Sequence, residues 1–266
     1  MSKVLLMAFP EQQAFDTHFN YISCLAKLLD GATLKCTQTL TKAALPNIDE
    51  KKNLIKLTKQ SLTDESRIVA IDKDYSYAST SWLPIKAYYL IFNILLTIEY
   101  VIKIQKNTFS RGHHSCVEEF TRKLKNKEIE FSVAELNIVY DQSILNHRNV
   151  AGANLSKKTS DGDMCKMAMR KIAYYKLEDW KKRNHYNGKR KTDKAKLTHH
   201  LANDFFVSIF DFPYYMRIRS NYRDFAFIEG VSTAETAQYF KKYFTFTVHF
   251  VKALEGLKNA LVRTRS

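Results

Sequence analysis

The sequence LPIKAYYLIFNILLTIEYVIKI, residues 83–104, decides the fold because it is the most apolar stretch of the chain. Its 22 residues are enough to cross a membrane as a helix. Lys86, Asn93 and Glu99 interrupt the stretch, and three such side chains in one span are costly in lipid. The stretch therefore predicts a helix that is buried on all sides in a helical bundle.

The composition supports a helical fold. Only 7 glycines and 4 prolines occur in 266 residues, which is too few for the many tight turns of an all-β chain. Apolar residues make up 45% of the chain, so a compact core is expected. No Walker A or GxGxxG pattern is present, and we expect no cofactor. The fold class predicted from these observations is all-α.

The charge balance points to a polyanionic partner. Lys and Arg number 42 and Asp and Glu 27, which gives a formal net charge of +15. Nucleic acid and anionic membranes both attract such a surplus. No stretch joins a strong apolar face to a Lys-rich face, so we expect nucleic acid and no membrane. Pro10, Glu11 and Gln12 stand where a signal peptide would need small residues, which predicts a cytoplasmic protein.

Further helices are predicted from hydrophobic spacing at 11–29, 115–125, 133–145, 163–183, 194–209 and 232–262. Ser232 and Glu235 have the spacing of a capping box at the start of the last helix. For the central apolar helix, the hydroxyl residues at 79–81 predict an N-cap, and Pro84 suits the first helical turn. Residues 146–163 and 184–191 are rich in Gly, Ser, Asn and Asp or in charge, and predict loops.

Residues 176–200 hold nine basic and three acidic residues, a dense share of the excess charge. Trp180, His185 and Tyr186 are interleaved with them, and such a pattern predicts phosphate contacts and stacking on exposed bases. The alternative is an ordinary solvated helix face and loop. The nucleic-acid-binding residues predicted here are Lys181, Lys182, Arg183, Lys189, Arg190, Lys191, Lys194 and Lys196.

Three blocks of the sequence carry helical motifs: AYYLIFNILL (87–96), GHHSCVEEF (112–120) and MRIRSNYRDF (216–225), the last followed by the helix at 239–261. Taken together, the three blocks resemble the HEPN family of helical proteins. The resemblance implies a bundle at 74–266 that contains an inserted basic segment at about 128–203, with an N-terminal helical extension at 1–73. It also implies frequent dimerisation and a role as an RNA-cleaving toxin, a defence effector or a non-catalytic partner in a two-gene module.

Ribonucleases of this family carry a His four to six residues after an Arg, and this chain lacks that spacing. A His moves the 2′-hydroxyl proton near neutral pH, and an Arg stabilises charge on the phosphate. Arg217, Arg219 and Arg223 form the matching element here, and His113 or His114 would supply the substitute histidine, with His199 and His200 as further candidates. The alternative for His113 and His114 is a helix cap or a packing role. The alternative for the arginines is a salt-bridge network with Asp224 and Glu229.

Two functions from different classes follow. The first is an RNA-targeting effector of a prokaryotic defence or toxin module, acting as a metal-independent endoribonuclease. The second is a non-catalytic nucleic-acid-binding or adaptor subunit that docks on a partner protein from the same gene module. The four cysteines Cys24, Cys36, Cys116 and Cys165 form no CxxC pair, and we expect reduced thiols and no metal site.

Overall fold

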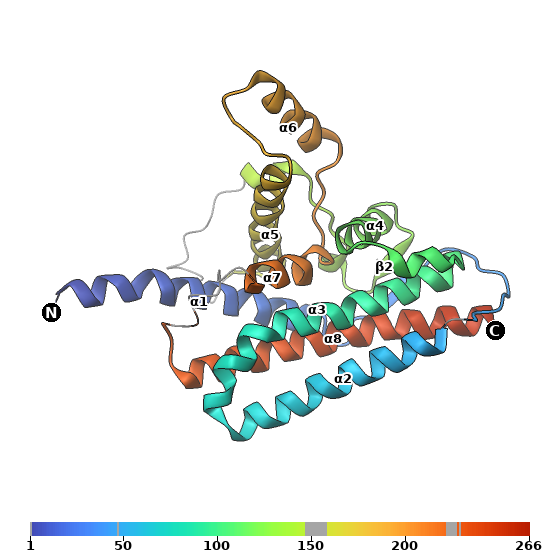
Figure 1. Cartoon of the computed structure of the whole chain (residues 1–266), viewed down its shortest axis with the longest axis horizontal. Helices are drawn as coiled ribbons and strands as arrows, with labels where there is room; N and C mark the ends of the chain where they lie inside the picture. The colour runs from blue at the N-terminus through green and yellow to red at the C-terminus, as the bar shows by residue number, and fades with distance from the viewer. Residues whose placement is uncertain (1, 47, 147–158, 222–227, 229) are drawn as a thin grey trace.

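A computed structural model of the chain describes residues 2–46, 48–146, 159–221, 228 and 230–266. The two longest helices of these ranges, α3 (Lys73–Lys103) and α8 (Thr233–Arg265), lie side by side through the middle of the molecule (Figure 1). Both helices contribute fully buried rings to the core, among them Tyr88 of α3 and Phe246 and Phe250 of α8. The predicted helical bundle is confirmed.

The central apolar stretch lies within α3 and is buried as predicted. This helix is long and apolar enough to cross a membrane, but 72% of its most apolar window is buried inside the protein, as in the core helix of a soluble protein. Glu99 is only 1% exposed and binds Lys103 at 2.7 Å and Arg111. Lys86 binds Glu65 on a neighbouring helix at 2.8 Å. The charges that interrupt the stretch are therefore paired within the protein.

The start of α3 was predicted wrongly, because the helix begins at Lys73 and not at residues 79–81. Asp72 caps it by accepting hydrogen bonds from the backbone N–H groups of Asp74 and Tyr75. Pro84 lies inside the helix, where its ring nitrogen cannot donate to the Thr80 carbonyl. The Thr80 hydroxyl reaches the Thr236 carbonyl of α8 at 3.4 Å. Packing against α8 thus keeps these early turns helical despite the proline.

The N-terminal region supplies α1 (Ser2–Leu28) and α2 (Ile48–Ile71). Helix α2 runs along α3 and α8 (Figure 1), and the sequence pattern did not predict it. Its buried aliphatic residues recur every seven positions and are Ile48, Ile55, Leu62 and Val69. A seam with one apolar residue per two turns is narrower than the usual apolar face of a helix, which explains why the helix was missed.

The capping box at the start of α8 is confirmed. The Ser232 hydroxyl accepts from the Glu235 N–H at 3.3 Å, and the Glu235 carboxylate accepts from the Ser232 N–H at 2.9 Å. These two bonds satisfy backbone donors that have no partner inside the helix. The predicted end at 262 extends to Arg265, whose guanidinium donates to the carbonyls of Val101 and Ile102.

The predicted helix at 133–145 is wrong. Two short 3-10 helices lie there, η2 (Ala134–Asn137) and η3 (Gln142–Asn146), with an extended residue between them. Tyr140 exchanges backbone hydrogen bonds with Val207, which requires extended backbone at that point. The Asn137 side chain also accepts from the Phe131 N–H at 2.6 Å and so occupies a local backbone group.

A small antiparallel sheet and two helical segments complete this part of the molecule. Strand β1 (Leu34–Cys36) pairs with β2 (Ile129–Phe131), with Lys35 opposite Glu130. Before β2 come η1 (Lys106–Ser110) and α4 (His113–Lys125), which begins two residues earlier than predicted. The strands were not predicted, because three-residue strands carry little alternation.

Helices α5 (Asp161–Arg183) and α6 (Lys191–Asn203) form an arm that projects from the bundle, and α7 (Asp211–Asn221) lies at its base (Figure 1). The predicted helix at 194–209 ends earlier, at Asn203, because the chain then turns inward and buries Phe205, Val207 and Phe210. Helix α7 was not predicted as a helix. The predicted loop at 184–191 forms the turn between α5 and α6, except that its last residue, Lys191, begins α6. Residues 147–158 of the other predicted loop lie outside the described residues.

The two segments predicted as additions contact each other. Lys27 of α1 binds Asp161 of α5 at 2.5 Å, and β1 from the N-terminal region pairs with β2. Buried residues of both segments belong to the same hydrophobic core as α3 and α8. The boundaries at 73, 128 and 203 therefore divide the sequence but not the core.

Candidate nucleic-acid interface

Arg217 and Arg219 lie on α7 and face different neighbours. Residues two positions apart on a helix are rotated by about 200° relative to each other, so the Arg217 and Arg219 side chains diverge from α7. The Arg217 guanidinium lies 5.3 Å from the ring centroids of both Tyr88 and Tyr89 on α3. The Arg219 guanidinium lies 4.0 Å from the ring centroid of Tyr175 on α5. Each arginine is therefore held on an aromatic face.

Within the described ranges, the contacts of Arg217 are with tyrosines and none is with a carboxylate. Its Nη2 donates to the Tyr89 hydroxyl at 3.5 Å, and its buried Nε has no hydrogen-bond partner. A guanidinium stacked on rings keeps in-plane N–H groups free for a phosphate. Arg223 and the suggested salt-bridge partners Asp224 and Glu229 lie outside the described residues. Arg217 is thus a positioned cation whose charge is not neutralised.

A cavity of about 690 Å³ lies between α7 and the C-terminal half of α5. Four cations line it: Lys182, Arg183, Arg217 and Arg219. Three tyrosines, one isoleucine and two acidic residues complete the lining. One acid, Asp179, binds Arg183 at 3.0 Å, and the other, Glu178, binds Lys181 at 2.9 Å. The structure thus brings the arginines of α7 and the end of the basic segment, more than 30 residues apart in the chain, to one cavity.

His113 is the first residue of α4 and lies beside Arg217 of α7. Its Nδ1 is 3.1 Å from the Tyr88 hydroxyl, and its ring is 4.1 Å from that of Phe92, centroid to centroid. Burial and the positive charge of Arg217 lower the pKa of His113. The imidazole is therefore neutral at pH 7. His113 and Arg217 share Tyr88 and Tyr89 as neighbours and form no direct hydrogen bond.

His114 connects α4 to the arm. Its Nδ1 lies 3.1 Å from Glu118, and its Nε2 lies 3.0 Å from Nη2 of Arg183. Because a guanidinium can only donate, Nε2 must accept, so the proton lies on Nδ1 and points to Glu118. Burial raises the pKa of Glu118, but the hydrogen bond from His114 and nearby cations lower it overall. Both ring nitrogens of His114 are occupied, which makes it a positioning residue for Arg183.

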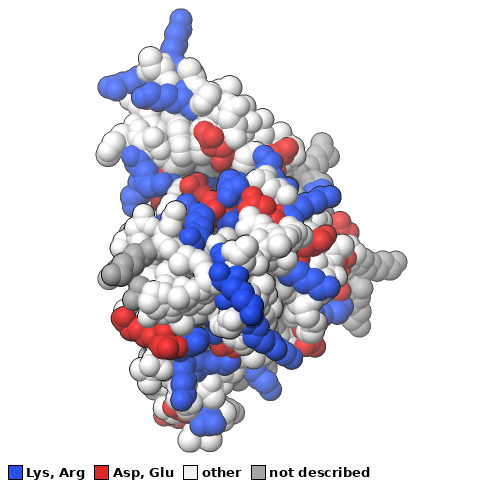
Figure 2. All heavy atoms as spheres, turned by 90° about the vertical axis from the view of Figure 1, so that its right-hand side faces the viewer, with Lys and Arg blue, Asp and Glu red and all other residues white. Residues whose placement is uncertain are grey.

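The remaining cations of the basic segment lie along the arm. Lys181 is paired with Glu178 near the end of α5, whereas five cations form no ion pair among the residues that the structure describes. These five are all exposed and are Lys189, Arg190, Lys191, Lys194 and Lys196. Blue side chains project from the top of the molecule in Figure 2, where α6 lies in Figure 1. The arm therefore carries a second, uncompensated positive surface.

Two residues of the predicted basic and aromatic segment make contacts within the protein. Lys176 is 3% exposed and binds Asp211 at 3.1 Å, so it holds α5 to α7 instead of facing solvent. The Trp180 ring stacks on His200 at 4.8 Å and 8°. The expected stacking of Trp180 on bases would require this contact to open. His199 and His200 do not line the cavity, and burial lowers the pKa of His200.

No group of three or more His, Cys, Asp or Glu side chains in the described residues is close enough to hold a metal ion. Cys24, Cys116 and Cys165 are buried free thiols, and Cys36 is half-buried. Burial raises the pKa of Cys24 and of Cys165 to about 12, so neither is a thiolate at neutral pH. These thiols act as small apolar core groups.

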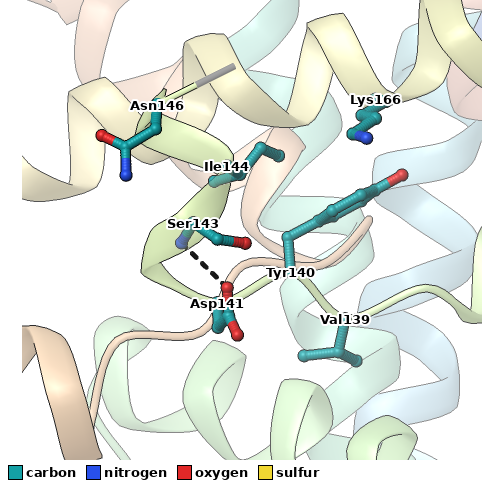
Figure 3. A pocket seen from close by; sticks show the side chains of 7 residues that line it. All are labelled: Val139, Tyr140, Asp141, Ser143, Ile144, Asn146 and Lys166. Atoms are coloured by element: carbon teal, nitrogen blue, oxygen red, sulfur yellow. Dashed lines mark hydrogen bonds between the residues drawn. The ribbon is translucent and has the colours of Figure 1, made fainter.

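A second cavity, of about 400 Å³, lies under η3 beside α5 (Figure 3). Lys166 is its cation, and Tyr140, Ser143 and Asn146 contribute polar groups. Asp141 caps the Ser143 N–H at 2.8 Å, as the dashed line in Figure 3 shows. One lysine beside one carboxylate gives little net charge, so this cavity is a weaker anion site than the one between α5 and α7.

The tyrosines that hold the arginines were missed as site residues. In the sequence, Tyr88 and Tyr89 are visible only as part of the apolar stretch, and no motif marks Tyr175. Their aromatic character was visible in the sequence, but their contacts join α7 to α3 and α5 and depend on the tertiary fold. No local spacing rule relates residues 88 and 217.

Comparisons with protein-family models, with curated proteins and with solved structures give no match to this chain.

Proposed function

We propose that this chain binds RNA through the cavity between α5 and α7. The observation that carries the proposal is the convergence of Lys182, Arg183, Arg217 and Arg219 on one cavity with tyrosine walls. Arginine forks bind phosphate oxygens in pairs, and tyrosine rings accept bases or sugars. Because Arg217 stacks on rings of α3 and Arg219 on a ring of α5, the two guanidinium groups would contact different phosphates of one strand at this cavity.

The exposed cations of the arm extend this surface. Lys189, Arg190 and Lys191 form no ion pair in the part of the chain that the structure describes, so a bound polyanion would not have to displace a partner. Phosphate binding of this kind releases counterions and weakens as salt rises. We expect the arm to add affinity without reading sequence.

The HEPN resemblance suggests the biological setting. We propose a role as a cytoplasmic RNA-targeting component of a prokaryotic defence or toxin module. The chain would act with a protein partner from the same module, and a homodimer is the alternative assembly. The missing Arg-to-His spacing favours the non-catalytic, RNA-binding form of this role.

One observation favours an endoribonuclease as the second candidate: His113 lies beside Arg217 and has a lowered pKa. If Nδ1–H donates to the Tyr88 oxygen, Nε2 is free to remove the 2′-hydroxyl proton of a ribose. The 2′-oxygen would then bond to the adjacent phosphorus, the P–O5′ bond would break, and the 5′-oxygen would take a proton from water. Arg217 would stabilise the charge on the phosphate.

The test is an anisotropy titration with fluorescently labelled single-stranded RNA in EDTA. We expect the double variant Arg217→Ala, Arg219→Ala to weaken binding by at least about 10-fold and to reduce the slope of log affinity against log salt by about 1.4, since each lost phosphate contact removes about 0.7. The same mixtures, separated on a gel, report cleavage, which His113→Ala would abolish if the second candidate is correct.

The matched control is Lys241→Ala, Lys242→Ala, which removes two exposed cations from α8. It lowers the net charge equally but lies outside the cavity lining. Equal losses in the two double variants would contradict binding in the cavity. Absence of RNA binding by the unaltered protein at low salt would overturn the proposed function.

A further inference from the structure

Two large aromatic side chains stand exposed on one face of α3. Trp82 is 58% exposed and Tyr89 is 39% exposed. They are seven residues apart, so they lie on the same side of the helix, about 10 Å apart along its axis. The other tryptophan of the chain, Trp180, is stacked on His200. An exposed indole of this size on a core helix calls for a ligand or partner.

This aromatic pair is continuous with the cationic site. The Tyr89 hydroxyl accepts from Nη2 of Arg217, and the Arg217 guanidinium lies over the Tyr89 ring. Tyr75 lies a further seven residues before Trp82, but Asp72 and Asp74 beside it would repel phosphates. The part of the face that suits a polyanion is therefore limited to Trp82 and Tyr89.

We propose that Trp82 and Tyr89 form a base-stacking platform that makes the RNA site selective for single strands. The inference rests on the proposed function, because the strand is held by Arg217 beside Tyr89. The spacing of about 10 Å exceeds the roughly 3.4 Å between neighbouring bases in a duplex strand. Bases on the two rings must therefore be separated from one another. A duplex keeps its base faces covered and cannot supply them.

The first test uses tryptophan fluorescence. Trp180→Phe keeps an aromatic ring against His200 and leaves Trp82 as the sole tryptophan. Single-stranded RNA of about 12 nucleotides should quench the Trp82 emission, and the duplex of the same length should not. Quenching by both forms, or by neither while the RNA still binds, would overturn the platform and leave the proposed function intact.

The second test measures affinity. Trp82→Ala should weaken binding of the single strand by about 5-fold to 150-fold, and Trp82→Phe by less than about 3-fold, because phenylalanine retains a stacking face. The control is Tyr77→Ala, which removes an exposed tyrosine that points about 140° away from Trp82 on α3. If Trp82→Ala binds RNA as well as the unaltered protein does, the face serves another partner, such as a protein, and the inference is wrong.

Discussion

Tyr88 and Tyr89 are adjacent in the sequence but have different structural roles. A rotation of about 100° per residue buries the Tyr88 ring completely and leaves Tyr89 39% exposed. Burial raises the pKa of Tyr88, so its hydroxyl stays protonated beside His113. The Arg217 guanidinium spans both rings at 5.3 Å. The pair therefore orients a histidine from inside the core and an arginine at the surface.

His18 on α1 gives a prediction about stability and pH. Burial, with a smaller contribution from Lys171, lowers the pKa of His18 to about 3. The unfolded chain, with an ordinary histidine pKa of about 6.5, takes up the proton first, so stability decreases as pH falls below about 6.5. Between about pH 7.5 and pH 5 we expect a loss of about 2 kcal/mol from this residue.

Urea denaturation of the unaltered protein and of His18→Gln at both pH values measures this loss. Glutamine cannot take up a proton, so the variant should show a pH dependence that is smaller by about 2 kcal/mol. His113 and His200 also have lowered pKa values and contribute equally to both proteins. Parallel pH profiles would show that His18 is not buried as a neutral group.

At the scale of elements, the sequence predicted an element correctly when the residues that determine it lie within that element. The capping box of α8 and its broad apolar face were predictable, because both lie within one helix. The interval 133–145 was not, because the Tyr140 and Val207 pairing joins segments far apart in the chain. Helix α2 was missed because its seam is narrow and its other faces are polar.

The α2 seam gives a second stability prediction. Leu62 is 2% exposed in the seam, whereas Leu57, on the same helix, is 68% exposed. Leu62→Ala should lower the free energy of unfolding by about 2–5 kcal/mol, because it removes buried methyl groups and leaves a cavity. Leu57→Ala, the matched control, should change it by less than about 0.5 kcal/mol. Equal effects in urea titrations would contradict the packing of α2 on α3 and α8.

At the scale of the whole molecule, the site arises from segments that the sequence separates. The residue types of the site were predictable, since charge and motif alone indicate Arg217, Arg219, Lys182 and Arg183. Their convergence was not, because it depends on α5 and α7 packing through the buried pair of Lys176 and Asp211. Because Lys176 is buried in this pair, the unpaired positive charges of the basic segment lie farther out, on the arm.

This separation of two cationic surfaces predicts that RNA length decides which one contributes. An RNA of about 4 nucleotides can occupy the cavity alone, whereas one of about 20 nucleotides can also reach the arm. The triple variant Lys189→Ala, Arg190→Ala, Lys191→Ala should therefore leave the short RNA unaffected. For the long RNA it should weaken binding several-fold and lower the salt slope by about 2, since each lost phosphate contact removes about 0.7.

The control for the triple variant is Lys241→Ala, Lys242→Ala, Lys252→Ala, which removes three exposed cations from α8. A general effect of net charge acts over a Debye length and would weaken both RNAs in both triple variants. A contact made by the arm weakens only the long RNA, and only in the arm variant. Anisotropy titrations of the two RNAs over a salt series separate these outcomes, because the slope counts contacts and the short RNA reports the cavity alone.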